Sequence, residues 1–197
     1  VWETIILMLM RHGYLTEPLG LGEVRDVARC MAIYYTFFCL GRGFYPHVTS
    51  MLSALKQHRY ELGIVSNAQF YTPIDLSLFL RDHSGDEYDD SLELFNPDLT
   101  FFSCEYGVAK PDPLLFRKLF DALYEYHILP QQVVFVGNDL ALDIRPAQQA
   151  GMKTALYTGD RRTTFVHDLH TTVVPDIVVP DWQHFPRLIS RSEKEAD

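Results

Sequence analysis

The sequence predicts an α/β fold, in which a Rossmann-like parallel sheet follows an α-helical N-terminal segment. After residue 43, short continuous apolar runs alternate with longer amphipathic stretches, as expected for parallel strands that helices cover on both faces. Before that point, apolar residues recur at helical spacing. We therefore divide the chain into a helical segment, 1–42, an α/β core, 43–190, and a charged tail, 191–197.

Two helices are expected within residues 1–42. Gly13 is expected to end the first helix, and the second spans residues 23–40. Gly41-Arg42-Gly43 forms a flexible joint before the core. The apolar residues at helical spacing are Trp2, Ile5, Ile6, Leu9 and Tyr14 in the first stretch and Val24, Val27, Ala28, Met31 and Tyr35 in the second.

Apolar runs in the core predict its strands, and amphipathic stretches between them predict its helices. Since helices separate most of the strands, the strands are expected to be parallel, with right-handed crossovers. The predicted strands are 62–65, 99–104, 133–136, 154–157 and 177–179, and the predicted helices are 48–58, 74–81, 113–126 and 144–150.

Composition narrows the classes of function. The chain of 197 residues has a net charge of −9, and it lacks the clusters of Lys and Arg that a nucleic-acid surface needs. The apolar run 5–10 is too short to cross a bilayer. We therefore expect a cytoplasmic protein that binds neither nucleic acid nor a membrane, and we assign it no oligomeric state. Cys30, Cys39 and Cys104 match no zinc pattern and are expected to be buried, reduced thiols.

Polar side chains follow three of the predicted strands. Ser66-Asn67 comes directly after 62–65, and Lys110-Pro111 comes after 99–104. Gly137-Asn138-Asp139, with Asp143 one helical turn further on, comes after 133–136. Because ligands of open α/β sheets bind outside the carboxyl ends of the strands, we expect these groups to meet at one edge.

This combination of groups suits a phosphate and a hard cation. A hydroxyl and free backbone N–H groups donate hydrogen bonds to phosphate oxygens, a lysine adds a point charge, and carboxylates suit Mg²⁺. Each motif also has a structural interpretation. Ser66-Asn67 could be turn chemistry, Lys110 a surface lysine, and Asp139 a helix cap with Asp143 as an acid in the first helical turn.

In this order the three motifs resemble motifs two, three and four of the haloacid dehalogenase (HAD) superfamily. The stretches 108–116 and 147–154 are similar to that family as well. The resemblance is good over residues 46–160, and the first 40 residues resemble the family's small α-helical cap.

The resemblance implies Mg²⁺-dependent hydrolysis of a small phosphorylated metabolite, a phosphate monoester, through an aspartyl-phosphate. It assigns catalytic roles to Lys110 and Asp143. Ser66, Asn67 and Lys110 would bind the phosphate. Asp139 and Asp143 would hold the metal together with Asn138, which occupies a position that is often Asp in the family.

The chain departs from the family at motif one. No apolar strand ends in Asp-x-Asp, the sequence that supplies the nucleophile. That strand should lie centrally, between the strands that carry Ser66 and Asp139, and its loss would leave two unpaired edges. We therefore predict a truncated gene product. Alternatively, in a complete protein, residues 1–10 have moved into the central slot.

Three other functions compete with this interpretation. A 2-haloacid dehalogenase needs no metal, which the paired Asp139 and Asp143 argue against. A non-catalytic protein that binds phosphate or a partner would explain the missing nucleophile. A phosphomutase needs an acid–base residue in the cap that we do not find. His167-x-x-His170 is a weak metal candidate, and Arg161-Arg162 could contact a substrate at the mouth of the site, although a solvated loop is favoured.

Overall fold

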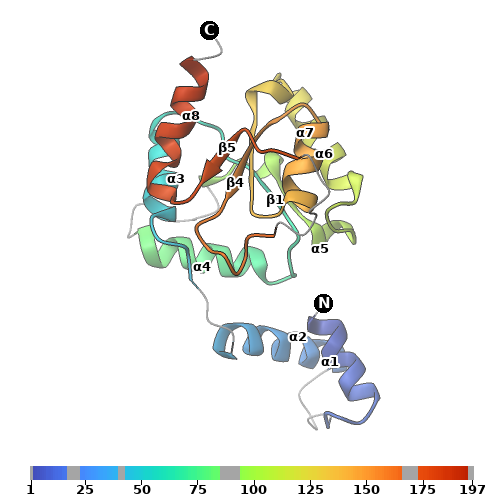
Figure 1. The fold of residues 1–197 in the computed structure, drawn as a ribbon. Helices are drawn as coiled ribbons and strands as arrows, with labels where there is room; N and C mark the ends of the chain where they lie inside the picture. Colours follow the sequence, from blue (N-terminus) through green and yellow to red (C-terminus); the bar gives the residue numbers. More distant parts are fainter. Residues whose placement is uncertain (1, 17–22, 40–42, 85–93, 166–172, 195–197) are drawn as a thin grey trace. The chain divides into compact units, whose positions relative to one another are not determined.

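The computed structural model describes residues 2–16, 23–39, 43–84, 94–165 and 173–194 (Figure 1). It divides into two compact units, Val1–Phe44 and Tyr45–Asp197. The first unit is helical, and the second alternates strands with helices. No helix in the described ranges is long and apolar enough to cross a membrane.

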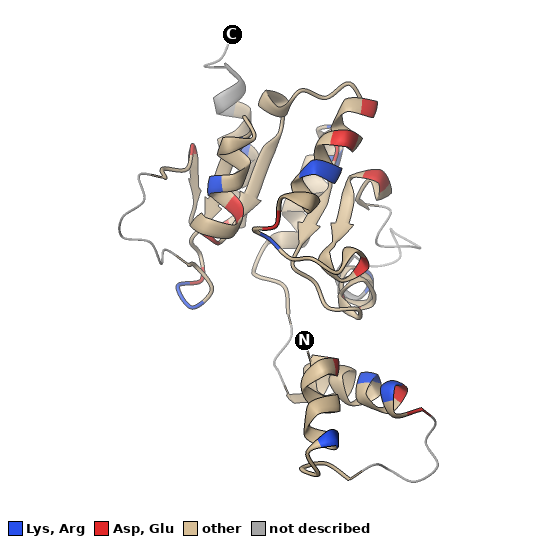
Figure 2. Ribbon diagram, turned by 90° about the vertical axis from the view of Figure 1, so that its right-hand side faces the viewer, with Lys and Arg blue, Asp and Glu red and all other residues tan. Residues whose placement is uncertain are grey.

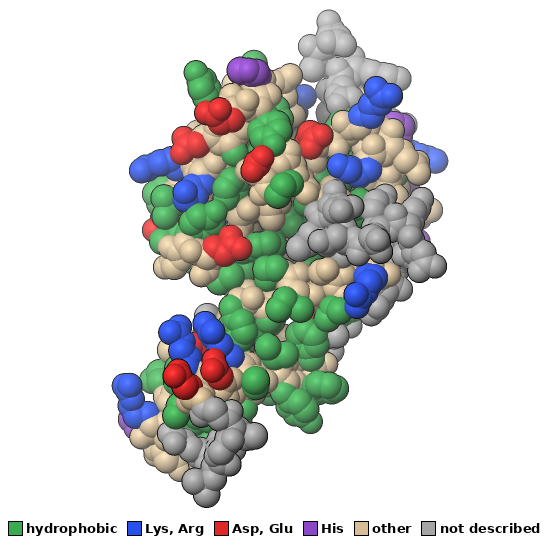
Figure 3. Space-filling model, turned by 180° about the vertical axis from the view of Figure 1, so that it is seen from behind, with side chains coloured by type: hydrophobic (Ala, Val, Ile, Leu, Met, Phe, Trp, Pro, Cys, Tyr) green, Lys and Arg blue, Asp and Glu red, His purple; other side chains and the backbone are tan. Residues whose placement is uncertain are grey.

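The first unit pairs α1 (Trp2–Arg11) with α2 (Val24–Tyr34), which continues as a π-helical turn, η1 (Tyr35–Cys39). Glu3 ties the two helices together through Arg25 Nε at 2.6 Å and Arg29 Nε at 3.2 Å. Because Trp2–Arg11 is a helix, the alternative in which residues 1–10 supply a central strand is wrong. Hydrophobic side chains remain on the surface of this unit (Figure 3), including Met8, Tyr34 and Phe38.

The second unit contains the predicted parallel strands. They are β1 (Ile64–Ser66), β2 (Thr100–Phe102), β3 (Val134–Gly137), β4 (Lys153–Tyr157) and β5 (Ile177–Val179). Every pairing is parallel, which confirms the predicted α/β fold. The strands form two groups, β1-β2 and β3-β4-β5, and among the described residues β1 does not pair with β3.

Helices cover both faces of the strands, as the continuous apolar runs predicted (Figure 1). On one side lie α3 (Val48–Gln57) and α8 (Phe185–Lys194), and on the other lie α6 (Pro113–Glu125) and α7 (Arg145–Gln149). The remaining helical elements are α4 (Thr72–Ser84), η4 (Pro97–Leu99), α5 (Ser103–Tyr106), η5 (Pro130–Gln132), η6 (Leu140–Ile144) and η7 (Trp182–His184).

Two apolar clusters hold these layers together. One joins Leu115 and Phe116 of α6 to Phe101 of β2 and Phe135 of β3, so α6 packs against both groups of strands. The other joins α3 and α8 to β4 and β5 around Val179, which is completely buried. Burial of a large apolar side chain contributes about 1.5–3 kcal/mol, so these contacts stabilise the packing of the helices on the strands.

Several sequence predictions need correction. The predicted strand 99–104 stops at Phe102, because Ser103 begins α5. A short apolar run does not distinguish a strand from a buried helical turn. All three cysteines are free but exposed, so their predicted burial is wrong. Residues 191–194 of the predicted charged tail belong to α8, and residues 195–197 lie outside the described ranges, so this division of the chain stays a prediction.

Candidate functional site

A buried ion pair joins two of the predicted motifs. Lys110 Nζ lies 2.6 Å from Asp143 Oδ1, and the two side chains are only 11% and 6% exposed. The same ammonium group donates to the Val65 carbonyl of β1 at 3.0 Å. Lys110 therefore connects the carboxyl ends of β1 and β3, which belong to different groups of strands. Apart from Lys153, the strands of the described part of the chain carry no acidic or basic residue (Figure 2).

The second oxygen of Asp143 binds the backbone after β3. Asp143 Oδ2 accepts from the N–H groups of Asn138 and Asp139, both at 3.1 Å. This approach requires a glycine at 137, because a Cβ there would clash with the Asp143 side chain. The glycine thus lets the Asp143 carboxylate lie against the loop.

Asn67 holds the lysine loop in place. Its Oδ1 accepts from the Lys110 N–H at 2.6 Å, and its Nδ2 donates to the Lys110 carbonyl at 3.1 Å. Ala68, the residue after Asn67, is anchored by the buried Ser103, whose hydroxyl oxygen accepts from the Ala68 N–H at 2.9 Å. In this structure Asn67 positions the loop, and its predicted contact with phosphate stays a prediction.

Replacing Asn67 by alanine is therefore expected to lower the free energy of unfolding of the core by about 1–2 kcal/mol, since two hydrogen bonds to one loop are lost. Chemical denaturation measures this change. Asn67→Asp keeps the acceptor for the Lys110 N–H and should lose less. Equal effects of the two variants would contradict the interpretation that Asn67 holds the Lys110 loop in place.

Ser66 ends β1 with a half-buried side chain. Its hydroxyl makes no hydrogen bond to the described residues. Lys110 Nζ is bonded to the carbonyl of the preceding residue, Val65, so the hydroxyl and the ammonium group lie at the same strand end. A hydroxyl without a partner and a lysine beside it can both donate hydrogen bonds to a phosphate oxygen.

The predicted metal ligands are partly engaged with protein atoms. Asp139 Oδ1 caps η6 by accepting from Ala141 N at 2.8 Å and Leu142 N at 2.9 Å, as its structural interpretation expected. Asn138 Nδ2 donates to the Thr163 carbonyl. Within the described ranges, no group of three or more His, Cys, Asp and Glu side chains could hold a metal ion.

The oxygens that remain still suit Mg²⁺. Asp139 Oδ2 and Asn138 Oδ1 have no hydrogen bond to the described residues. Mg²⁺ commonly binds one or two protein carboxylates and takes its other ligands from phosphate and water. Asp139 and Asn138 therefore fit such an ion. Asp143 fits less well, because both of its oxygens are already bonded.

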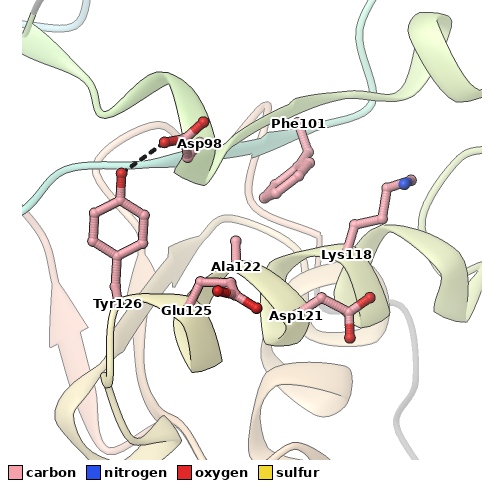
Figure 4. A pocket seen from close by; sticks show the side chains of 7 residues that line it. All are labelled: Asp98, Phe101, Lys118, Asp121, Ala122, Glu125 and Tyr126. Atoms are coloured by element: carbon pink, nitrogen blue, oxygen red, sulfur yellow. Dashed lines mark hydrogen bonds between the residues drawn. The ribbon is translucent and has the colours of Figure 1, made fainter.

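A pocket of about 370 Å³ lies elsewhere on the core (Figure 4). Tyr126 donates to Asp98 Oδ2 at 2.7 Å there, which raises the pKa of the tyrosine. Asp98 precedes β2 and Tyr126 follows α6, so the pocket lies near the amino end of β2, and no predicted site residue lines it. The lining residues are Asp98, Phe101, Lys118, Asp121, Ala122, Glu125 and Tyr126.

The order of the motifs and their meeting at the strand ends agree with a comparison of the whole sequence with models of known protein families. The family model of haloacid dehalogenase-like hydrolases matches residues 17–151. The chain belongs to this family. The predicted family and the predicted class of enzyme, a hydrolase, are thereby confirmed.

Known members of the HAD family resemble the chain in sequence and in fold. A glyceraldehyde 3-phosphate phosphatase from Methanothermobacter thermautotrophicus is 30% identical over 175 residues, which cover 85% of this chain and 71% of that enzyme. For an enzyme of the same name from Pyrococcus furiosus, 28% identical, the chain spans only 55% of its length.

Two solved structures show the same fold. A 2-haloacid dehalogenase from Pseudomonas syringae has a TM-score of 0.64 at 20% identity, with 96% of this chain and 70% of that chain covered. A HAD hydrolase from Bacillus subtilis, bound to magnesium, has a TM-score of 0.58 at 17% identity, with 95% and 78% covered. Both support the predicted HAD-like fold and, at this identity, the fold alone.

The structure thus brings Lys110 and Asp143 into contact, and it places Asn67, Asn138 and Asp139 within hydrogen-bonding distance of one or the other. Sequence reasoning missed Val65, Ser103 and Thr163. Ser103 had a detectable signal, a hydroxyl inside an apolar run. The contributions of Val65 and Thr163 come from their carbonyls, which leave no signal in a sequence. His167 and His170 lie outside the described residues.

Proposed function

We propose that this HAD-family chain serves the Mg²⁺-dependent hydrolysis of a small phosphate monoester in the cytoplasm. The observation that carries the proposal is the buried Lys110–Asp143 pair at the carboxyl edge of the strands, with the free hydroxyl of Ser66 at the same strand end as the Lys110 ammonium group. Glyceraldehyde 3-phosphate is the first substrate to test, because it is the substrate in the name of the relatives that are about 30% identical.

In this proposal each residue has a separate role. Ser66 donates its hydroxyl to a phosphoryl oxygen, and Lys110 neutralises the charge on the same group. Asp139 and Asn138 hold Mg²⁺, which would stabilise the charge that develops on the phosphoryl oxygens. Asp143 positions Lys110, and Asn67 positions the loop that carries it. We also propose that residues 1–42 form an α-helical cap and that residues 43–190 form the HAD-like core.

The nucleophile is not among these residues. Formation of an aspartyl-phosphate needs a carboxylate at the end of a strand, and no strand of the described part is followed by Asp-x-Asp. The proposed hydrolysis therefore applies to a protein in which that strand is supplied. Binding of the phosphate ester needs only Ser66, Lys110 and the metal ligands, so binding can be tested on residues 1–197 themselves.

The test is calorimetric titration of the chain with glyceraldehyde 3-phosphate, with and without Mg²⁺. We expect binding that Mg²⁺ strengthens. Ser66→Ala should weaken it about fivefold, since a hydrogen bond is worth about 1 kcal/mol. Ser50→Ala, an exposed serine on α3, is the matched control and should change nothing. Binding that ignores both Mg²⁺ and Ser66→Ala would contradict the proposal.

A 2-haloacid dehalogenase is the rival to test, since a solved structure of that name has the same fold. That reaction needs no metal. The rival would replace the phosphatase proposal if 2-chloropropionate bound the chain without Mg²⁺ while glyceraldehyde 3-phosphate failed to bind even in the presence of Mg²⁺.

A further inference from the structure

A short turn, residues 160–163, is attached directly to the candidate site. Asn138 Nδ2 donates to the Thr163 carbonyl, and the Asn138 carbonyl accepts from the Phe165 N–H at 2.8 Å. The Leu140 N–H donates to the Phe165 carbonyl at 3.1 Å, which completes a parallel bridge between the two segments. These hydrogen bonds therefore fix the turn relative to the loop that carries Asn138 and Asp139.

Internal hydrogen bonds fix the shape of the turn. The Asp160 carbonyl accepts from the N–H groups of Thr163 and Thr164 at 3.1 and 3.0 Å. The Asp160 carboxylate accepts from the Arg162 N–H at 2.9 Å. These bonds hold the turn in one shape before any ligand binds, which lowers the entropy cost of binding there.

Tyr45 holds the turn from a second direction. Its hydroxyl lies 2.8 Å from Thr163 Oγ1, and its ring packs 5.0 Å from that of Tyr157, at the end of β4. Because Tyr157 is buried in the core, its packing against Tyr45 fixes the position of the Tyr45 hydroxyl that contacts Thr163. The turn is thus anchored to both β4 and the loop after β3.

The turn presents two guanidinium groups. Arg161 and Arg162 are both exposed, and Arg161 makes no ion pair or hydrogen bond within the described residues. Arg162 Nε lies 3.6 Å from Asp160 Oδ1, and its side chain is 92% exposed, so this pair contributes little and leaves the cation available. In a chain with a net charge of −9, the turn thus places two adjacent cations next to Thr163, whose carbonyl accepts from Asn138 of the site.

We propose that Arg161 and Arg162 select phosphate monoesters that carry a second anionic group, such as a carboxylate. This inference rests on the proposed function, because it assigns the phosphate itself to Ser66 and Lys110. Guanidinium groups bind carboxylates in pairs of parallel hydrogen bonds. In this proposal the turn binds a carboxylate a few bonds from the phosphate, whereas a phosphate ester whose other end is uncharged makes no such ion pair.

The experiment compares two esters on one carbon skeleton. 3-Phosphoglycerate carries a carboxylate where glyceraldehyde 3-phosphate carries an aldehyde. Calorimetric titration of the full chain in Mg²⁺ should show about tenfold tighter binding of the acid. Arg161→Gln and Arg162→Gln should each reduce this preference about threefold, and the double variant should abolish it, while the affinity for the aldehyde stays unchanged.

Arg59→Gln is the matched control. Arg59 is an exposed arginine between α3 and β1, at the amino end of the strand, and the change removes the same charge. It should leave the preference intact. Equal binding of the two esters by the unmodified chain, or a preference that survives the double variant, would overturn this inference alone. Failure of both esters to bind would overturn the proposed function, and the inference with it.

Discussion

Replacing Asp143 by asparagine is expected to lower the free energy of unfolding of the core by about 3–5 kcal/mol, the cost of breaking a buried ion pair. The carboxylate accepts three hydrogen bonds, from Lys110 Nζ and from the N–H groups of Asn138 and Asp139. An amide has one acceptor atom fewer, and it leaves the Lys110 ammonium group buried without a counter-ion. Urea denaturation, followed by circular dichroism, measures the loss.

A double-mutant cycle separates the ion pair from the rest of this effect. Lys110→Met alone leaves Asp143 buried with two backbone donors, and the double variant Lys110→Met with Asp143→Asn removes both charges. If the pair is coupled, the double variant should be at least 1 kcal/mol more stable than the sum of the single losses predicts. Asp121→Asn, an exposed aspartate on α6, is the control and should stay within about 0.5 kcal/mol of the unmodified protein. Additive losses would show that the pair does not interact.

The sequence predicts at which edge of the sheet the residues of this site meet better than it predicts which atoms they contact. Apolar runs locate the strands, and the rule that parallel strands present their carboxyl ends at one edge brings Lys110 and Asp143 together although 33 residues separate them. The roles within the site are harder to predict. Asn67 was expected to bind phosphate, and that stays a prediction. Its two contacts with the backbone of Lys110, 43 residues away, were not expected, because a backbone partner has no signature in sequence.

The arrangement of the strands shows a second limit. Local patterns predict strands and their parallel direction, but the pairing of neighbours depends on contacts between distant segments. β1 and β3 are joined at their ends by Lys110 rather than by a strand ladder among the described residues. The turn 160–163 illustrates the same point, because its attachment to Asn138 runs through backbone carbonyls that any residue could supply.

Gly137→Ala is expected to destabilise the core by about 3 kcal/mol, at the upper end of the range for overpacking. The reason is space and not backbone conformation, since Gly137 is not among the glycines with a positive φ. An added Cβ would overlap the Asp143 side chain, which is buried and held by its three hydrogen bonds, so the carboxylate cannot move aside without breaking them. Gly43→Ala is the matched control, because no atom of the described residues lies within 4 Å of a Cβ at that position. Urea denaturation of the two variants should therefore give a large loss for Gly137→Ala and almost none for Gly43→Ala. Equal stability of the two would mean that Asp143 does not rest against the loop after β3, and the assignment of Lys110 to the phosphate site would lose its structural basis.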